Sequence, residues 1–143
     1  METIQTDVLI IGGGGAGLCA ALAAKEQGSE VLLVSKTPIG KSTCTFLSVG
    51  FFSLAGKGVS PENHLAETLK TGKDINSREL AEVLVKEAPE RVREVERLGL
   101  AGQWHKGGFS CLGRAPVWGA DIVGVLIRAA QKEGVSFLPW IMI

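Results

Sequence analysis

The chain has 143 residues, of which 45% are hydrophobic and 21% charged, and its 15 basic residues balance its 15 acidic ones. This composition is typical of a globular domain, and a net charge of zero gives no long-range attraction to nucleic acid or to an anionic membrane. No apolar run is long enough to span a bilayer and no signal peptide is recognisable, so we expect a cytoplasmic location, no membrane span and no nucleic-acid partner.

Cysteine and histidine spacing gives no metal site. Cys19, Cys44 and Cys111 are odd in number and contain no CxxC pair, which favours reduced thiols in a reducing compartment. His64 and His105 are isolated and have neither the spacing of metal ligands nor a neighbouring nucleophile. We therefore predict no catalytic residue and no metal ligand in this chain.

The first elements in chain order are a strand, a glycine turn, a helix and a second strand. Residues 7–11 are a short β-branched run that indicates a strand buried on both faces, and four glycines follow it. Residues 16–27 have helical spacing and end before Gly28, which suits a helix C-terminus. Residues 30–35 form a second apolar run, so the segment predicts a βαβ unit with a right-handed crossover.

The middle of the chain predicts two helices. Residues 36–57 lack periodicity, whereas Ser60 followed by proline indicates a capped helix to about residue 71. Asn76 resembles the cap of a longer helix, which Pro89 should kink or divide. The expected apolar stripe of that helix consists of Leu80, Leu84, Ala88, Val92 and Val95.

The last third of the chain predicts irregular backbone over residues 101–118, a helix over 121–132 and a final strand over 135–143. The predicted fold is α/β: a Rossmann-like βαβ unit with a parallel sheet and a helical insertion at about residues 58–100, before the third strand. We expect residues 1–143 to form a single dinucleotide-binding domain.

The glycine turn carries a dinucleotide-binding fingerprint. Its G-x-G-x-x-G pattern follows a predicted strand and opens a predicted helix, which is the context the motif requires. Glycines there permit the tight turn, the approach of the backbone to a pyrophosphate and close packing of the helix on the sheet. The residues concerned are Gly12, Gly13, Gly14, Gly15, Ala16 and Gly17.

The end of the second strand departs from that fingerprint. A carboxylate is expected there to hold the adenosine ribose, but this chain has Ser35 and then Lys36. A serine can still bind a ribose hydroxyl, while the lysine leaves a 2′-phosphate, and therefore NADP, open. The residues alone thus allow FAD, an NAD(P)-binding Rossmann module or a non-catalytic nucleotide-binding module.

The chain resembles the succinate dehydrogenase/fumarate reductase flavoprotein family, which includes L-aspartate oxidase. The resemblance rests on residues 6–21, on 31–36, where Ser-Lys is common in that family, and on Lys41-Ser-Thr-Cys44. It continues through residues 71–74, 87–91 and 107–119 and so covers nearly the whole chain.

This resemblance implies FAD as the cofactor and a flavin-dependent oxidoreductase acting on a dicarboxylate-like substrate in the full-length protein. It places the pyrophosphate at the glycine turn, the adenosine at Ser35 and Lys36, and the flavin beside Ser42, Thr43, Cys44 and Gly50. Where membrane-bound members place a histidine bonded covalently to FAD, this chain has Thr43, so non-covalent FAD is expected.

Members of that family run to several hundred residues. We therefore expect this chain to be the N-terminal part of a longer flavoprotein, not catalytically competent alone. Arg114 lies in the segment that approaches the substrate in the family, so the resemblance gives it a binding role. An unpaired edge at the last predicted strand, residues 137–143, favours a homo-oligomer.

Overall fold

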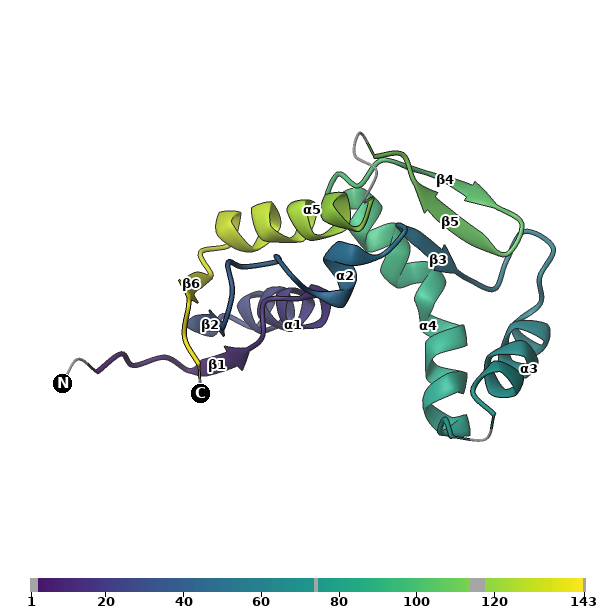
Figure 1. The fold of residues 1–143 in the computed structure, drawn as a ribbon, viewed down its shortest axis with the longest axis horizontal. Coiled ribbons are helices and arrows are strands. Elements are labelled where there is room, and N and C mark those ends of the chain that lie inside the picture. Colours follow the sequence, from purple (N-terminus) through teal and green to yellow (C-terminus); the bar gives the residue numbers. More distant parts are fainter. Residues whose placement is uncertain (1–2, 74, 114–117, 143) are drawn as a thin grey trace. The chain divides into compact units, whose positions relative to one another are not determined.

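The structure is a computed structural model that describes residues 3–73, 75–113 and 118–142. It divides into two compact units, which Figure 1 shows as a ribbon. The first unit comprises Met1–Val49 and Arg114–Ile143, and the second comprises Gly50–Gly113. The second unit is therefore inserted into the sequence of the first.

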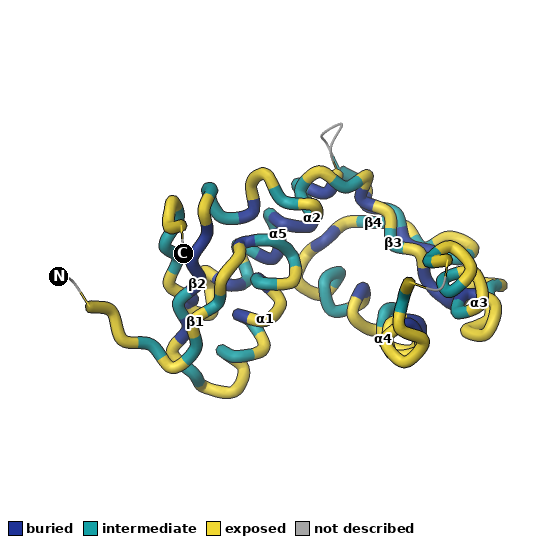
Figure 2. Tube along the Cα trace, turned by 60° about the horizontal axis from the view of Figure 1, so that its bottom comes forward, coloured by how far each residue is buried: buried dark blue, intermediate teal, exposed yellow. Residues whose placement is uncertain are grey.

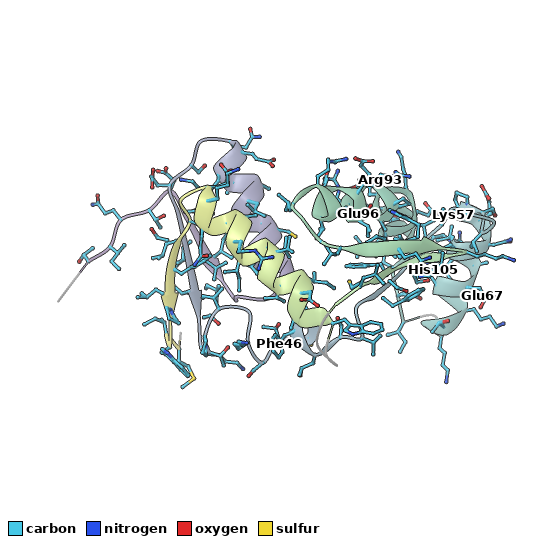
Figure 3. All side chains as sticks on the ribbon, turned by 90° about the horizontal axis from the view of Figure 1, so that it is seen from above. Phe46, Lys57, Glu67, Arg93, Glu96 and His105 are labelled. Atoms are coloured by element: carbon cyan, nitrogen blue, oxygen red, sulfur yellow. The ribbon has the colours of Figure 1, made fainter. Side chains whose placement is uncertain are left out.

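The first unit is built on a parallel three-stranded sheet. Strand β2 (Val31–Ser35) lies in the middle, between β1 (Val8–Ile11) and β6 (Ser136–Pro139). Helices α1 (Gly15–Glu26) and α5 (Gly119–Lys132) pack against each other on the same side of this sheet (Figures 1 and 3). The predicted α/β fold with a βαβ unit is thus confirmed, as is the parallel third strand.

Only one face of β1 is covered, which corrects the prediction that this strand is buried on both faces. Leu9 and Ile11 are 50% and 67% exposed, whereas Val8 and Ile10, which alternate with them, are half-buried. The reason is that β1 is an edge strand of the described sheet and both helices lie on one side of it. Burial in the unit is concentrated in β2 and along α5 (Figure 2).

The ends of two elements in the first unit follow from local backbone preferences. Gly28, with φ of +80°, donates its N–H to the carbonyl of Lys25 at 2.8 Å and ends α1, as predicted. Strand β6 is shorter than the predicted final strand, because Trp140 adopts a left-handed φ of +66° directly after Pro139. Ile143, the predicted end of that strand, lies outside the described residues.

The second unit contains an antiparallel sheet that the sequence did not predict. Strand β5 (Gly108–Cys111) pairs with β3 (Phe51–Ser53) and with β4 (Gly102–His105), so residues predicted to be irregular are a hairpin. Its glycines are required by packing, since a Cβ on Gly102 would overlap the Phe109 ring. Because glycine has no side chain, these strands lack the alternation of apolar and polar residues by which a strand is normally recognised.

Two helices complete the second unit. Helix α3 (Pro61–Thr71) begins as predicted, with the Ser60 hydroxyl accepting the N–H of Asn63 at 3.2 Å. Helix α4 (Arg78–Arg97) begins one residue later than predicted, because its cap is Ser77. The predicted cap, Asn76, instead donates its side-chain amide to the carbonyl of Thr68 at 2.9 Å and so joins the two helices.

The buried face of α4 differs from the predicted stripe. Ala81, Val85 and Val92 are buried, whereas Leu80 and Leu84 are 72% and 51% exposed. Of the predicted stripe, Val92 is therefore the only fully buried member, because the helix is rotated by about one residue relative to the expectation. Helix α4 is also continuous through Pro89, so the predicted division into two helices is wrong, while the alternative, a kink, stays a prediction.

The second unit extends beyond the predicted insertion. Its range, Gly50–Gly113, encloses residues 58–100 and adds β3 and the β4–β5 hairpin to the two helices. Our assignment of the whole chain to one domain stays a prediction. Within the described part of the chain, no helix is both long enough and apolar enough to cross a membrane.

Candidate functional site

The glycine turn between β1 and α1 has the geometry its motif predicts. Gly12 has a φ of +115°, which suits glycine alone, and donates its N–H to the Val34 carbonyl of β2 at 2.8 Å. A Cβ on Gly17 would overlap the Gly12 carbonyl oxygen, so only a glycine lets α1 start directly against the turn. A Cβ on Gly12 would meet no atom within 4 Å, which leaves space beside the turn.

Helix α1 begins at an N-cap residue that has no side chain to cap it. Gly14 is the N-cap, and no described side chain caps it. The first intrahelical bond runs from the N–H of Leu18 to the carbonyl of Gly14 at 3.0 Å, while the N–H of Gly15 is donated to the Thr45 hydroxyl at 3.2 Å. Because the first turn also lacks acidic residues, the positive end of the helix dipole faces this space without compensation.

The loop after β2 folds back over the glycine turn. Gly40 donates its N–H to the carbonyl of Gly13 at 2.8 Å, and Thr43 lies beside Gly14, with its Cβ 3.5 Å from where a Cβ on that glycine would be. The structure therefore brings together two segments that the sequence analysis assigned to opposite halves of one cofactor: residues 12–17 and residues 42–44.

Ser35 and Lys36 lie at the end of β2 next to this turn. The Ser35 side chain is buried, and its hydroxyl accepts the N–H of Thr37 at 3.4 Å. That hydroxyl would be 3.3 Å from a Cβ on Gly13, so it points toward the glycine turn. Lys36 is exposed. The carboxyl end of β2 thus offers a hydroxyl and an ammonium group at the edge of the site.

Residues 42–44 form the entry to a short helix, α2 (Cys44–Leu47). Ser42 is exposed with a φ of +55°, and Cys44 is exposed at the first helical position. The Thr43 hydroxyl accepts the N–H of Phe46 and donates to the carbonyl of Gly40, both at 3.1 Å. This threonine therefore fixes both the loop and the helix that follows it.

Two contacts with α5 hold this loop in place, and sequence reasoning missed both. Gly119 donates its N–H to the Ser48 carbonyl at 3.1 Å, and a Cβ there would overlap the carbonyl of Thr45. A Cβ on Gly40 would overlap Val123 of α5. Thr45 itself, which anchors the amide of Gly15, was also missed. These residues matter because of contacts with distant segments, and no local sequence pattern distinguishes such a glycine or threonine from any other in a loop.

Four further residues were named in the sequence analysis: Gly50, Arg114, His64 and His105. Gly50 belongs to the second unit, where it is buried, has a φ of +68° and accepts the N–H of Cys111 at 2.8 Å. Its role beside the flavin stays a prediction. Arg114 lies outside the described residues. His64 is buried in α3 with its Nε2 3.4 Å from the Ser53 hydroxyl, which is a structural environment, and His105 is exposed in β4.

Comparison with known proteins shows the family to which the chain belongs. The family described as the FAD binding domain matches residues 7–141. The chain belongs to this family. Its FAD-binding domain is 40% identical, over 102 residues, to a chain of the fumarate reductase (CoM/CoB) of Methanothermobacter marburgensis; that alignment covers 68% of this chain and 19% of the relative.

Further proteins are similar to this FAD-binding domain. L-Aspartate oxidase of Streptomyces coelicolor is 32% identical over 145 residues, which cover 92% of this chain and 25% of that protein. The solved Sdh1 complex of Mycobacterium smegmatis in the apo form has a TM-score of 0.83 and 27% identity, and the match covers 98% of this chain and 28% of that one. The predicted resemblance is confirmed. The chain spans about a fifth to a quarter of the length of these curated relatives.

The geometry of the glycine turn fits FAD. A pyrophosphate needs backbone approach without a side chain, amide donors and a favourable dipole. The open space at Gly12 supplies the first, and the N-terminus of α1 supplies the other two. FAD as the cofactor of this domain agrees with every one of these features.

Proposed function

We propose that this FAD-binding domain holds FAD non-covalently between its glycine turn and the loop of residues 36–48. Gly12, Gly13, Gly14, Gly15, Ala16 and Gly17 would hold the pyrophosphate. The single observation that carries this proposal is the fold of that loop back over the turn, through the bond from the Gly40 amide to the Gly13 carbonyl. It supports one continuous site made from two distant segments.

We assign the adenosine end of the site to Ser35 and Lys36. A ribose hydroxyl can donate to the Ser35 hydroxyl oxygen, which points toward the glycine turn at the end of β2. The exposed Lys36 ammonium group is suited to the outer edge of the nucleotide, where it adds positive charge beside a dianionic pyrophosphate. Neither role needs the carboxylate found in the general fingerprint.

We assign the flavin end to Ser42, Thr43 and Cys44, and the part of Gly50, which belongs to the second unit, stays a prediction from the sequence. Thr43 already uses its hydroxyl as donor to Gly40 and as acceptor for Phe46, so its part is to hold the loop against the cofactor. It stands where covalent members place a histidine, and a threonine hydroxyl forms no such bond to the flavin ring. That substitution supports non-covalent binding.

In the longer protein we propose a flavin-dependent oxidoreductase that acts on a dicarboxylate-like substrate. The proposal is supported by relatives named fumarate reductase and L-aspartate oxidase. When bound, FAD supplies the redox chemistry, and the protein orients it. The present chain contributes cofactor binding and is not proposed to turn over substrate alone. A cytoplasmic location and self-association stay predictions.

Ligand titration of the 143-residue chain tests this proposal. We expect FAD to bind more tightly than NAD or NADP, and FAD at about 100 times its Kd should stabilise the fold by about 2.7 kcal/mol. Tighter binding of NADP would overturn the assignment of the site. Acid denaturation of the loaded protein should release all flavin into solution, and flavin retained on the chain would refute non-covalent binding.

A matched pair of serine variants tests the adenosine end. Ser35→Ala removes a hydroxyl that faces the glycine turn and should weaken FAD binding by about three- to tenfold. Ser29→Ala is the control, because Ser29 lies before β2 and uses its backbone N–H, which alanine keeps, to bond the carbonyl of Ala24. Equal FAD affinities for the two variants would remove Ser35 from the site.

A further inference from the structure

A cavity of about 280 Å³ lies wholly within the second unit. Its wall is formed by the segment after β3, by α4 and by the β4–β5 hairpin. The lining includes Leu54, Lys57, Pro89, Arg93, Trp104 and His105. Figure 3 shows Lys57, Arg93 and His105 around the hairpin, together with Glu96.

The ionisable side chains of the described residues that line this cavity are all of basic type. Lys57 comes from the loop, Arg93 from α4 and His105 from β4, so three separate elements contribute them. Glu90 pairs with Arg93 at 3.3 Å but also with Arg97 at 2.9 Å, so a single carboxylate is shared between two arginines. With Glu96 bonded to Trp104, two carboxylates stand against Lys57, Arg93 and Arg97, so a small excess of positive charge remains around the cavity and favours an anion.

Trp104 forms a fixed aromatic wall in the same cavity. Its indole Nε1–H is donated to Glu96 at 2.8 Å, and its ring packs edge-on against Phe109 with centroids 5.3 Å apart. The Arg93 guanidinium lies 5.3 Å from the centroid of the Trp104 ring, and Lys57 Nζ donates to the Trp104 carbonyl at 3.2 Å. One cation thus lies over the indole ring and a second is bonded to the backbone of the same residue, so positive charge and an aromatic side chain occur together in this cavity.

The backbone at Lys57 gives an independent indication that its side chain is used. Lys57 has a φ of +41° between two glycines, Gly56 at +123° and Gly58 at +89°. Glycine would adopt this left-handed conformation without strain, whereas a lysine there is unfavourable. Non-glycine residues in this conformation are enriched at binding sites, where the surrounding structure holds them in place.

From these observations we infer that the cavity is a binding site for a small organic anion with a flat apolar body. The anionic group pairs with Lys57 and Arg93, and the apolar body lies against Trp104 beside Leu54 and Pro89. A volume of about 280 Å³ admits a ligand of one or two rings. The larger neighbouring cavity is less selective, because Glu62, Glu82 and Lys86 give its lining both signs of charge.

Calorimetric titration of the full chain with 2-naphthoate tests this inference. We expect saturable binding with a Kd on the order of 1 mM, the range that the usual efficiency per atom gives for a ligand of this size. The uncharged isostere 2-naphthamide and the small anion acetate should each bind at least about fivefold more weakly. Equal binding of the amide, or the absence of saturable 2-naphthoate binding, overturns the inference.

Three variants place the ligand in this cavity. Arg93→Gln should weaken 2-naphthoate binding by about five- to tenfold, whereas Arg91→Gln, on the same helix but paired with Glu87 and Glu94 outside the cavity, should leave it unchanged. Lys57→Gly should weaken binding by a similar factor while the unfolding temperature is unchanged or rises, because glycine relieves the backbone at this position. Unchanged affinity in both cavity variants refutes the site, as does equal loss in the Arg91 control.

Discussion

Two alanine substitutions in the first unit should have opposite effects, although both replace a glycine inside a helix. In an open helical position, alanine is more stable than glycine by about 1 kcal/mol. Gly124 of α5 is such a position, since the nearest atom to an added Cβ is the flexible Arg128 Nη1 at 3.4 Å. Gly124→Ala should therefore stabilise the chain by about 0.5–1 kcal/mol.

Gly17→Ala should instead destabilise it. The added Cβ would overlap the carbonyl oxygen of Gly12, and a backbone atom cannot be moved by rotating a side chain. Overpacking of this kind costs about 3 kcal/mol at its upper range, against a helix-propensity gain of about 1, which leaves a net loss of about 2 kcal/mol. The unfolding temperature should fall by about 4–8 °C.

The same substitution tests the cofactor site. To relieve the overlap, α1 must move from the turn by about 1 Å or more, and its first amides move with it. FAD affinity should then fall about tenfold, whereas Gly124→Ala should leave it unchanged. Thermal unfolding with and without FAD measures both quantities. If Gly17→Ala retains the stability and the FAD affinity of the original chain, the close approach of α1 to the turn is refuted.

Three further outcomes are expected. Thr43→Val should lower stability by about 1–2 kcal/mol and weaken FAD binding, while Thr43→Ser retains both, as thermal unfolding and titration will show. Ser77→Ala should cost about 1 kcal/mol in thermal unfolding, because it removes the cap of α4. The bonds from Arg97 and Arg93 hold the pKa of the Glu90 carboxyl below its usual value. These bridges therefore stabilise the fold at pH values above the usual pKa, and the stabilisation is lost as pH falls through the lowered pKa. Glu90→Gln should make acid unfolding less steep, as a pH titration of unfolding will show.

The sequence predicted those elements whose signals are local. The β-branched run before the glycines, the cap at Ser60 and the terminator at Gly28 each act within a few residues, and each was found where expected. Helix α4 shows the limit of such reasoning. Leu80 with Leu84, and Ala81 with Val85, form neighbouring stripes of equal helical period, and only the packing partner decides which one is buried.

The same distinction applies to the site. The glycine turn was predictable because the residues that its backbone conformation requires are consecutive in the sequence. Thr45 and Gly119 were not, since their importance arises from contacts with Gly15 and with α2 that join distant parts of the chain. The hairpin of β4 and β5 was missed for a related reason: Gly102 is required by the Phe109 ring, and its missing side chain obscures the strand pattern.

The order of strands in the first unit has a consequence for how the chain folds. Strand β6 pairs with β2 in register Leu32 to Ser136, so the two partners are separated by about a hundred residues that include the whole second unit. During synthesis from the N-terminus, β1, α1 and β2 emerge long before β6 is available. We therefore expect the second unit to acquire its structure while β2 still has an unpaired edge, and closure of the parallel sheet to be the slow, late step of folding.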